Sequence, residues 1–328
     1  MISFIVRRVL VSVPVLIGSS IVVFTMAKFA GDPLEDLKLR NPPVPRRTIE
    51  LESHRLGLDR SSPEQYWNWI KGLVLHGDFG QSVQPSRSIR PELGDHLLVT
   101  ARLVAASVII ALVLALISGV LSAVKQYSVI DYSTTFMSFL FLSMPVFWFA
   151  VLLKTAAIWY NQHIAVGKFY TIGERSPFLP DRSALTYFTD AAGHLVLPAV
   201  ALGLGGYASW SRFTRASMLE VLNSDYVRLA RSKGLRPRQV LTRHALRTAL
   251  IPLTTVTALD IATLMGGAIV TETVFQWHGM GVLFIDALRE DDTYLLLGWL
   301  MIAATIVILF NLVADILYGV LDPRIRRA

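Results

Sequence analysis

The chain has 328 residues, of which 53% are hydrophobic and 17% are charged, and its mean hydropathy is +0.51. This composition excludes an ordinary water-soluble domain, in which about 25% of residues are charged. The net charge of +7 does not indicate a nucleic-acid-binding protein, because the basic residues gather in segments between apolar runs. No cysteine is present, which excludes disulfides and a thiolate metal site.

Several apolar runs are long enough to cross a bilayer, which takes about 20 residues. They lie at 9–30, 98–124, 133–160, 194–218, 249–272 and 297–321. The first run exceeds the roughly 7–15 residues of a signal-peptide core, so we expect an uncleaved first span. The sequence therefore predicts an all-α integral membrane protein with six transmembrane helices.

The long segment 31–97, between the first two spans, carries helix signals of its own. Gly31-Asp32-Pro33 ends the first span, because proline cannot continue the helical hydrogen-bond ladder. Arg55-Leu56-Gly57 is typical of a helix end closed by glycine, and Ser62-Pro63-Glu64 of a capped helix start. We expect a small folded segment here, either a cap at the membrane interface or a contact for a partner or substrate.

The charge distribution predicts that both chain ends are cytoplasmic. In this orientation the inner segments 1–8, 125–132, 212–248 and 322–328 hold 15 Lys/Arg and 4 Asp/Glu. The outer segments 31–97, 161–193 and 273–296 hold 13 and 17. Basic residues concentrate in the cytoplasmic loops of membrane proteins, so the two sets are assigned with the basic one inside.

Three positions within the spans are candidates for a translocation path. Pro145 predicts a break or kink in the third span. Asp260 stands in the middle of the fifth span, where a carboxylate costs about 3 kcal/mol and should face a cavity or a partner. Gly266 follows in the same span. The glycine cluster at 203–206 in the fourth span predicts close helix packing, with a hinge as the alternative.

The most informative segment is Asp225–Pro252, which is long, strongly basic and patterned for helices. Nine Lys/Arg lie between residues 212 and 247, against two acidic residues. Gly234 is expected to close a first helix in a left-handed conformation, and Pro237 to start a second. The second helix has an apolar stripe at Val240, Leu241, Ala245 and Leu246. Such a ridge in water indicates a docking partner, the alternative being that the charges only set topology.

DYVRLARSKGL (225–235) and RHALRTALIP (243–252) resemble the EAA loop of permease subunits in bacterial ABC importers, in particular those for dipeptides and oligopeptides. Further matching stretches are VVFTMAKFAGDP (22–33), HRLGLD (54–59), QYWNWIKGLVLHGDFGQSV (65–83), HLVLPAVALG (194–203), GGAIVTETVFQWHGMG (266–281) and DILYGVLDPRIR (315–326). Glu-Ala-Ala itself is absent, since Arg228-Leu229-Ala230-Arg231 takes its place, and residues 34–53 match only loosely.

The resemblance implies a type I ABC importer permease fold. The implied parts are a first span at 1–30, a folded extracytoplasmic segment at 31–97, a five-helix core at 98–321 and a cytoplasmic tail at 322–328. A coupling loop at 223–248 would join this permease to an ATPase. The implied coupling residues are Asp225, Arg228, Ala230, Lys233, Gly234, Leu235, Leu241 and Leu246. The implied function is to form half of a path for peptides and to couple that path to ATP hydrolysis.

The partners implied are a second homologous permease, one or two ABC ATPases and an extracytoplasmic substrate-binding protein or lipoprotein, in a bacterial inner or plasma membrane. The chain itself is expected to be no enzyme and to hold no metal or cofactor; ATP and Mg²⁺ belong to the ATPases. A P-loop is not expected, because the Gly-Lys pair at 167–168 has Gln162 at the first glycine position and Phe169 after it.

Other functions stay open at this point. The same machinery could carry another cargo, such as a nickel chelate, glutathione or a glycoside. An ion-coupled secondary transporter is a different class and would show paired broken helices or several charges at mid-membrane. A structural or assembly factor would have no need of the basic segment.

Overall fold

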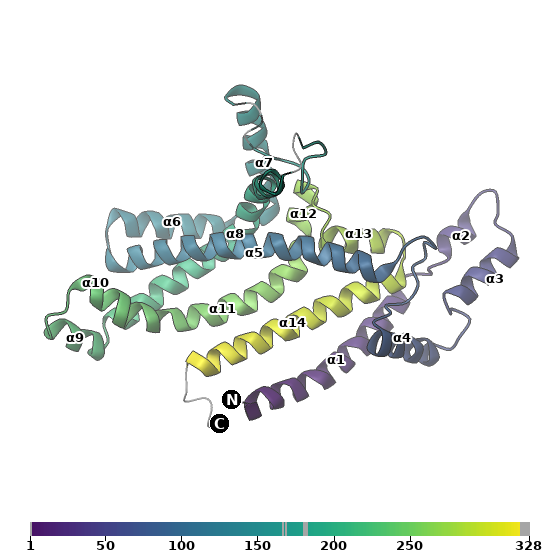
Figure 1. The fold of residues 1–328 in the computed structure, drawn as a ribbon, viewed down its shortest axis with the longest axis horizontal. Helices are drawn as coiled ribbons and strands as arrows, with labels where there is room; N and C mark the ends of the chain where they lie inside the picture. The colour runs from purple at the N-terminus through teal and green to yellow at the C-terminus, as the bar shows by residue number, and fades with distance from the viewer. Residues whose placement is uncertain (1, 166, 168, 180–182, 322–328) are drawn as a thin grey trace. The chain divides into compact units, whose positions relative to one another are not determined.

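The computed structural model describes residues 2–165, 167, 169–179 and 183–321, and over these ranges the regular structure is helical (Figure 1). The expected cytoplasmic tail, 322–328, lies outside the described residues. In chain order the helices are α1 (Ile2–Ala30), α2 (Glu35–Leu39), α3 (Arg46–Arg55), α4 (Ser62–His76), α5 (Ile89–Val124), α6 (Val129–Ser143), α7 (Val146–His163), α8 (Ala184–Leu222), α9 (Asp225–Ser232), α10 (Pro237–Gln239), the π-helical stretch η1 (Val240–Ala245), α11 (Leu246–Gly267), α12 (Ile269–Phe275), α13 (Met280–Arg289) and α14 (Thr293–Leu321).

Five helical segments of the described chain are long and apolar enough to cross a membrane: those containing α1, α5, α8, α11 and α14. A sixth crossing is possible only if α6 and α7 are counted together, because they are bent by 107° at the break between them. The six predicted spans thus correspond to five long helices and one bent pair. The prediction of an all-α membrane protein is confirmed.

The third predicted span, 133–160, is not a single helix but consists of α6 and α7. Pro145 has no N–H to donate, and it forces the preceding residue out of the helical region. Met144 accordingly lies at φ −89° and ψ 127°, an extended conformation. The predicted break is therefore confirmed, but it is a corner between two helices rather than a kink within one.

Several helices continue beyond the apolar runs that revealed them. α8 has 39 residues, so it is about 58 Å long and exceeds the roughly 30 Å of the bilayer's hydrocarbon core. Its first turn is capped outside the apolar run by Ser183, whose hydroxyl accepts a hydrogen bond from the Thr186 N–H at 3.3 Å. Hydropathy marks the lipid-facing part of a helix, whereas caps mark its ends. The fifth predicted span, 249–272, conversely stops at Gly267, and α12 begins separately.

The chain divides into two compact units. The first comprises Met1–Ile5, Ala101–Trp277 and Leu309–Ala328, and the second Val6–Thr100 with His278–Ile308. In the first unit α8 is the central helix, because it contacts α6, α7, α9, α11 and α12. The basic segment 223–248 and the candidates for a translocation path all belong to this unit.

Glycines allow α8 to approach α5 closely. A Cβ atom at Gly119 would lie 2.7 Å from the backbone oxygen of Ser211, and one at Gly203 would lie 2.8 Å from that of Ser107. The predicted packing role is therefore confirmed for Gly203. At Gly205 a Cβ atom would meet nothing within 4 Å, so this glycine is not required for packing.

The second unit folds the segment after α1 against the first turns of α14. Gly57 closes α3 with a φ of 66°, as the sequence predicted. The cap of α4 is Ser61, one residue before the predicted Ser62, and it forms a capping box with Glu64. Buried apolar side chains of this unit include Phe24, Trp69, Leu297 and Met301. Asp292 accepts hydrogen bonds from the Ser82 hydroxyl and from the Leu295 N–H, the latter at 3.1 Å. The segment is thus folded, whichever side of the membrane it occupies.

We predict that Gly119→Ala destabilises the protein by about 1–3 kcal/mol, since the added methyl group forces α5 away from α8. Gly94→Ala is the matched control on the same helix, because a Cβ atom there meets nothing within 4 Å. It should stabilise slightly, by about 0.5–1 kcal/mol. Thermal unfolding of the two purified variants in detergent tests this, and equal melting temperatures would contradict the assigned close approach.

Candidate functional site

The basic segment forms a folded elbow (residues 223–248) beyond the end of α8, built from α9, a turn, α10 and η1 (Figure 1). Gly234 makes the turn with a φ of 77°, and its N–H donates to the carbonyl of Arg231 at 3.0 Å. A Cβ atom at Gly234 would meet nothing within 4 Å. The glycine is therefore required for its left-handed backbone and not for lack of space.

The second helix of the elbow begins at Pro237, as predicted, but it does not stop before the fifth span. It passes through the π-helical stretch η1 directly into α11. A π-helical insertion shifts the register of the faces on either side of it. The elbow is thus joined to the membrane core by helix on both sides, through α8 and through α11.

One face of the elbow is buried within the chain. Its apolar side chains form a cluster made of Ala123, Met218, Val227, Ala230, Val240, Ala245 and Ala249, with Leu241 and Leu246 packed against it. Val227 and Ala245 are fully buried, at 0% exposure. The sequence predicted a ridge at Val240, Leu241, Ala245 and Leu246 that is open to a partner. Val240 and Ala245 are instead buried, and Leu241 and Leu246 are half-buried, because α9 and η1 fold back onto the end of α8.

The opposite face of the elbow is exposed and carries most of its charge. The exposed members of the predicted coupling set are Asp225, Arg228, Lys233, Gly234 and Leu235. Apolar side chains stand among them, since Leu229 is 56% and Tyr226 44% exposed. A basic surface that also exposes large apolar side chains fits a protein partner better than bulk water.

A buried ion pair holds the base of the elbow. Arg215 of α8 donates from Nε to Oδ1 of Asp131 at 2.7 Å and from Nη2 to Oδ2 at 2.9 Å. The Ser122 hydroxyl of α5 donates to the same carboxylate, as does the Tyr127 N–H at 2.9 Å. The Asp131 side chain is 4% exposed. These contacts, here called the inner clamp (Ser122, Asp131 and Arg215), fasten the ends of α5, α6 and α8 together.

A pocket of about 510 Å³ lies between α7, α8, α11 and α12 in the first unit. Its lining residues are Val146, Phe147, Leu202, Gly205, Gly206, Ser209, Trp210, Asp260, Thr263, Leu264, Val270 and Thr271. Asp260 accepts a hydrogen bond from Trp210 Nε1 at 2.6 Å. Pro145 stands directly before the wall residues Val146 and Phe147. Of the three predicted path candidates, Asp260 therefore lines the pocket, Pro145 directly precedes two of its wall residues, and Gly266 lies in the last turn of α11.

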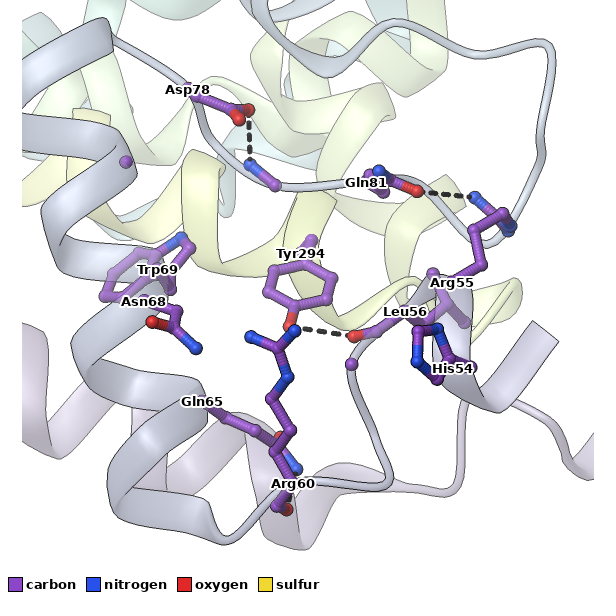
Figure 2. A pocket seen from close by; sticks show the side chains of 13 residues that line it. His54, Arg55, Leu56, Arg60, Gln65, Asn68, Trp69, Asp78, Gln81 and Tyr294 are labelled. Atoms are coloured by element: carbon purple, nitrogen blue, oxygen red, sulfur yellow. Dashed lines mark hydrogen bonds between the residues drawn. The ribbon is translucent and has the colours of Figure 1, made fainter. Parts of the chain in front are cut away.

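The second unit holds a smaller pocket, of about 190 Å³, between α3, α4 and the start of α14 (Figure 2). Tyr294 donates its hydroxyl to the Leu56 carbonyl at 3.0 Å, and Gln65 donates to the Arg60 carbonyl at 2.7 Å. Arg55 donates to backbone carbonyls of the 82–83 stretch. Figure 2 shows the Arg60 guanidinium group beside the Tyr294 hydroxyl. Most of these polar groups donate hydrogen bonds to the chain's own backbone carbonyls. These hydrogen bonds fasten the turn between α3 and α4.

Ser176, in the loop after α7, meets Asp190 and His194 of α8, although no sequence motif indicates it. The Ser176 hydroxyl donates to Asp190 Oδ1 at 2.6 Å, and His194 Nδ1 faces the Gly173 carbonyl at 2.9 Å. Tyr170 stacks on the histidine ring at 4.3 Å. The trio is closed by the Ser176 hydroxyl, which also lies 3.4 Å from His194 Nε2. It ties the loop after α7 to α8.

Lys154 of α7 donates a hydrogen bond to the Val274 carbonyl at 2.6 Å, in the last turn of α12. A cation is favoured at a helix C-terminus, where carbonyl groups lack helical partners. Among the described residues, no group of three His, Cys, Asp or Glu side chains could hold a metal ion.

The chain matches two protein families, over separate ranges of its sequence. Residues 111–327 match the family "Binding-protein-dependent transport system inner membrane component", and residues 1–94 match the N-terminal family of the same membrane components. The chain belongs to this family. Membership covers the elbow, the inner clamp and the large pocket in one stretch. The prediction of a transport subunit, and not an enzyme, is confirmed by it.

Similar proteins in the family are named peptide permeases. The oligopeptide transport system permease protein AppB of Bacillus subtilis is 37% identical over 99% of both chains. The dipeptide transport system permease protein DppB of Escherichia coli K12 is 36% identical, also over 99% of both. A solved chain of the MetNI methionine ABC transporter, in an inward-facing form, aligns with a TM-score of 0.52 at 18% identity, over 70% of this chain and 96% of that chain. This likeness confirms the expected importer permease fold.

The sequence did not predict the inner clamp. In the sequence, Arg215 is one of nine basic residues between positions 212 and 247, and Asp131 is one acidic residue in a short predicted turn. The two lie 84 positions apart. A signal was nevertheless present, because an isolated acid in an otherwise basic set of inner segments has many potential partners and is costly to bury without one.

We predict that Asp131→Ala lowers the stability of the protein by about 3–5 kcal/mol, because it leaves the Arg215 guanidinium partly buried without its partner. The double variant Asp131→Ala, Arg215→Ala should cost less than the two single changes added together. Asp225→Ala is the control, since its pairing with Arg228 at 3.8 Å is fully exposed, and its melting temperature should be unchanged. Additive losses in the double variant would show that the clamp does not couple the helices.

Proposed function

We propose that this chain is the membrane-spanning permease subunit of an ATP-binding-cassette importer for peptides. It would form half of the translocation path and couple it to ATP hydrolysis by partner ATPases. The observation that carries the proposal is the elbow: a folded, half-buried element with an exposed basic face, joined by helices to the pocket-lining core. The peptide permeases named above support the cargo.

In the proposed orientation, the elbow and both chain ends face the cytoplasm of a bacterium. The basic content of the segment 212–248 supports this, because positive charge accumulates on the cytoplasmic side. The folded segment after α1 then lies outside, where it is available to a substrate-binding protein. Both assignments depend on the side of the membrane on which the elbow lies, so locating the elbow would test both.

The ATPase would contact the exposed face of the elbow. Asp225, Arg228, Lys233 and Leu235 are the side chains that we assign to this contact, around the turn at Gly234. Ala230, Leu241 and Leu246 act from within, by keeping α9 and η1 fixed to α8. Movement of the docked ATPases then displaces a rigid body, because the buried cluster and the inner clamp resist bending between elbow and core.

The core helices carry this movement to the proposed path. α8 contacts α6, α7 and α11, and these helices bring Asp260 and the corner at Pro145 to the large pocket. Gly266 stands at the junction of α11 and α12, where a glycine pair permits a change of helix direction. We assign the pocket to the translocation path and Gly266 to its hinge.

Further partners complete the proposed machine. They are a second homologous permease, which supplies the other half of the path, one or two ATPases, which hold ATP and Mg²⁺, and an extracytoplasmic substrate-binding protein. Reconstitution of the complex in liposomes tests the proposal. Uptake of a labelled tripeptide should require ATP on the side of the membrane where the ATPases lie. It should stop when the ATPases are left out.

Two results would overturn the proposal. Uptake by this chain with an ion gradient and without ATPases would indicate a secondary transporter. ATP-driven uptake of a nickel chelate, glutathione or a glycoside, with no uptake of peptides, would retain the importer and replace its cargo.

We predict that Gly234→Val lowers peptide uptake per hydrolysed ATP about tenfold, because a β-branched residue at this left-handed position costs about 1–3 kcal/mol and distorts the docking turn. Membrane insertion should be normal, since the turn has no neighbour to clash with. Gly234→Asn is the matched control and should retain most coupling, because asparagine tolerates the left-handed region. Normal coupled uptake in Gly234→Val would exclude the elbow as the coupling contact.

A further inference from the structure

Among the described residues that line the large pocket, Asp260 is the one with an ionisable side chain. The other walls are apolar side chains, two glycines and the hydroxyl groups of Ser209, Thr263 and Thr271. A carboxylate in such surroundings, inside a membrane helix, is destabilised unless a cation or several donors approach it.

The chain itself supplies little of this stabilisation. Among the described residues the hydrogen-bond donor to Asp260 is Trp210, which binds Oδ2 through its indole N–H at 2.6 Å. No lysine or arginine in the described part of the chain pairs with this carboxylate. A buried indole group also fixes the carboxylate in one orientation, since Trp210 is 0% exposed.

The pocket is large enough for part of a chain-like substrate. Its volume of about 510 Å³ exceeds that of one side chain and lies in the range of ligand sites, about 300–1,000 Å³. Apolar walls accept side chains of varied kind, whereas hydroxyl groups bind peptide N–H and C=O groups. One fixed negative charge adds a single requirement, namely a cation at one place on the ligand.

We propose that Asp260 binds the terminal ammonium group of a peptide as it passes through the permease. This ammonium is the cation that every peptide with an unmodified N-terminus carries, whatever its sequence. The inference rests on the proposed function, because it takes peptides as the cargo. It makes the permease itself selective for a free N-terminus, in addition to any selection by a binding protein.

The absence of cysteine from the chain allows a direct test of the pocket's charge. Ser209→Cys places a thiol among the lining residues, in a complex whose other subunits are free of cysteine. We measure its reaction rates with a cationic and an anionic methanethiosulfonate reagent. The ratio of cationic to anionic rate should fall about tenfold when Asp260→Asn is added. It should be retained in Asp260→Glu, which keeps the charge and controls for altered packing.

Protection by peptides then tests the ligand. Without the binding protein, tri-alanine should slow the labelling of Ser209→Cys, and N-acetyl-tri-alanine should not. In Asp260→Asn this difference should disappear. Equal protection by both peptides would overturn the proposal, because the pocket would then bind peptides without sensing the ammonium. A rate ratio that Asp260→Asn leaves unchanged would overturn it too, and would indicate that a cation of the second permease neutralises Asp260.

Failure of this inference is distinguishable from failure of the proposed function. The complex with the unaltered chain, supplied with its binding protein and ATP, should take up labelled tri-alanine. If it does so and the two peptides protect equally, only the role of Asp260 is wrong. If no ATP-dependent peptide uptake occurs, the proposed function is wrong regardless of the labelling result.

Discussion

The ion pair between Asp131 and Arg215 is the contact on which the arrangement of the first unit depends. A carboxylate with 4% exposure is stable here because two guanidinium N–H groups, a hydroxyl and a backbone N–H all donate to it. Asp131 belongs to α6 and its side-chain partners to α5 and α8, so none of these three helices can shift alone without leaving a buried charge unsatisfied. α8 thereby becomes stiff at the point where it leaves the core and enters the elbow. A stiff joint at that point is what the transfer of movement from a docked partner requires.

Two interruptions of helix border the same pocket. Val146 and Phe147 follow the corner at Pro145, and Val270 and Thr271 follow the junction between α11 and α12. Irregular backbone at membrane depth is tolerated where it lines a cavity or is covered by protein, because lipid supplies no hydrogen-bond partners. Lys154 donates to a carbonyl group in the last turn of α12, that of Val274.

The sequence predicted the features that depend on local chemistry. Hydropathy located the apolar helices, Pro145 the corner, and Gly234 the left-handed turn, because each of these is determined by a few neighbouring residues. It did not predict the pairing of Asp131 with Arg215 or of Trp210 with Asp260, which join positions 84 and 50 apart. It also misjudged the apolar face of the elbow. A short amphipathic helix has the same pattern whether its apolar side meets a partner or its own chain, and only the path of α9 back onto α8 decides between them.

That burial changes how the elbow would work. If Val227, Ala230 and Val240 were exposed, docking would supply the free energy that folds the segment, and affinity would be reduced by the cost of ordering it. Because these residues are already buried against Met218, the exposed basic face is preformed. Binding can then be weakened or strengthened by surface charges without unfolding the elbow. A preformed elbow also transmits force in both directions, since the cluster beneath it resists compression as well as extension. Occupancy of the pocket beside α8 would consequently influence the shape presented to the partner, just as the partner would influence the pocket.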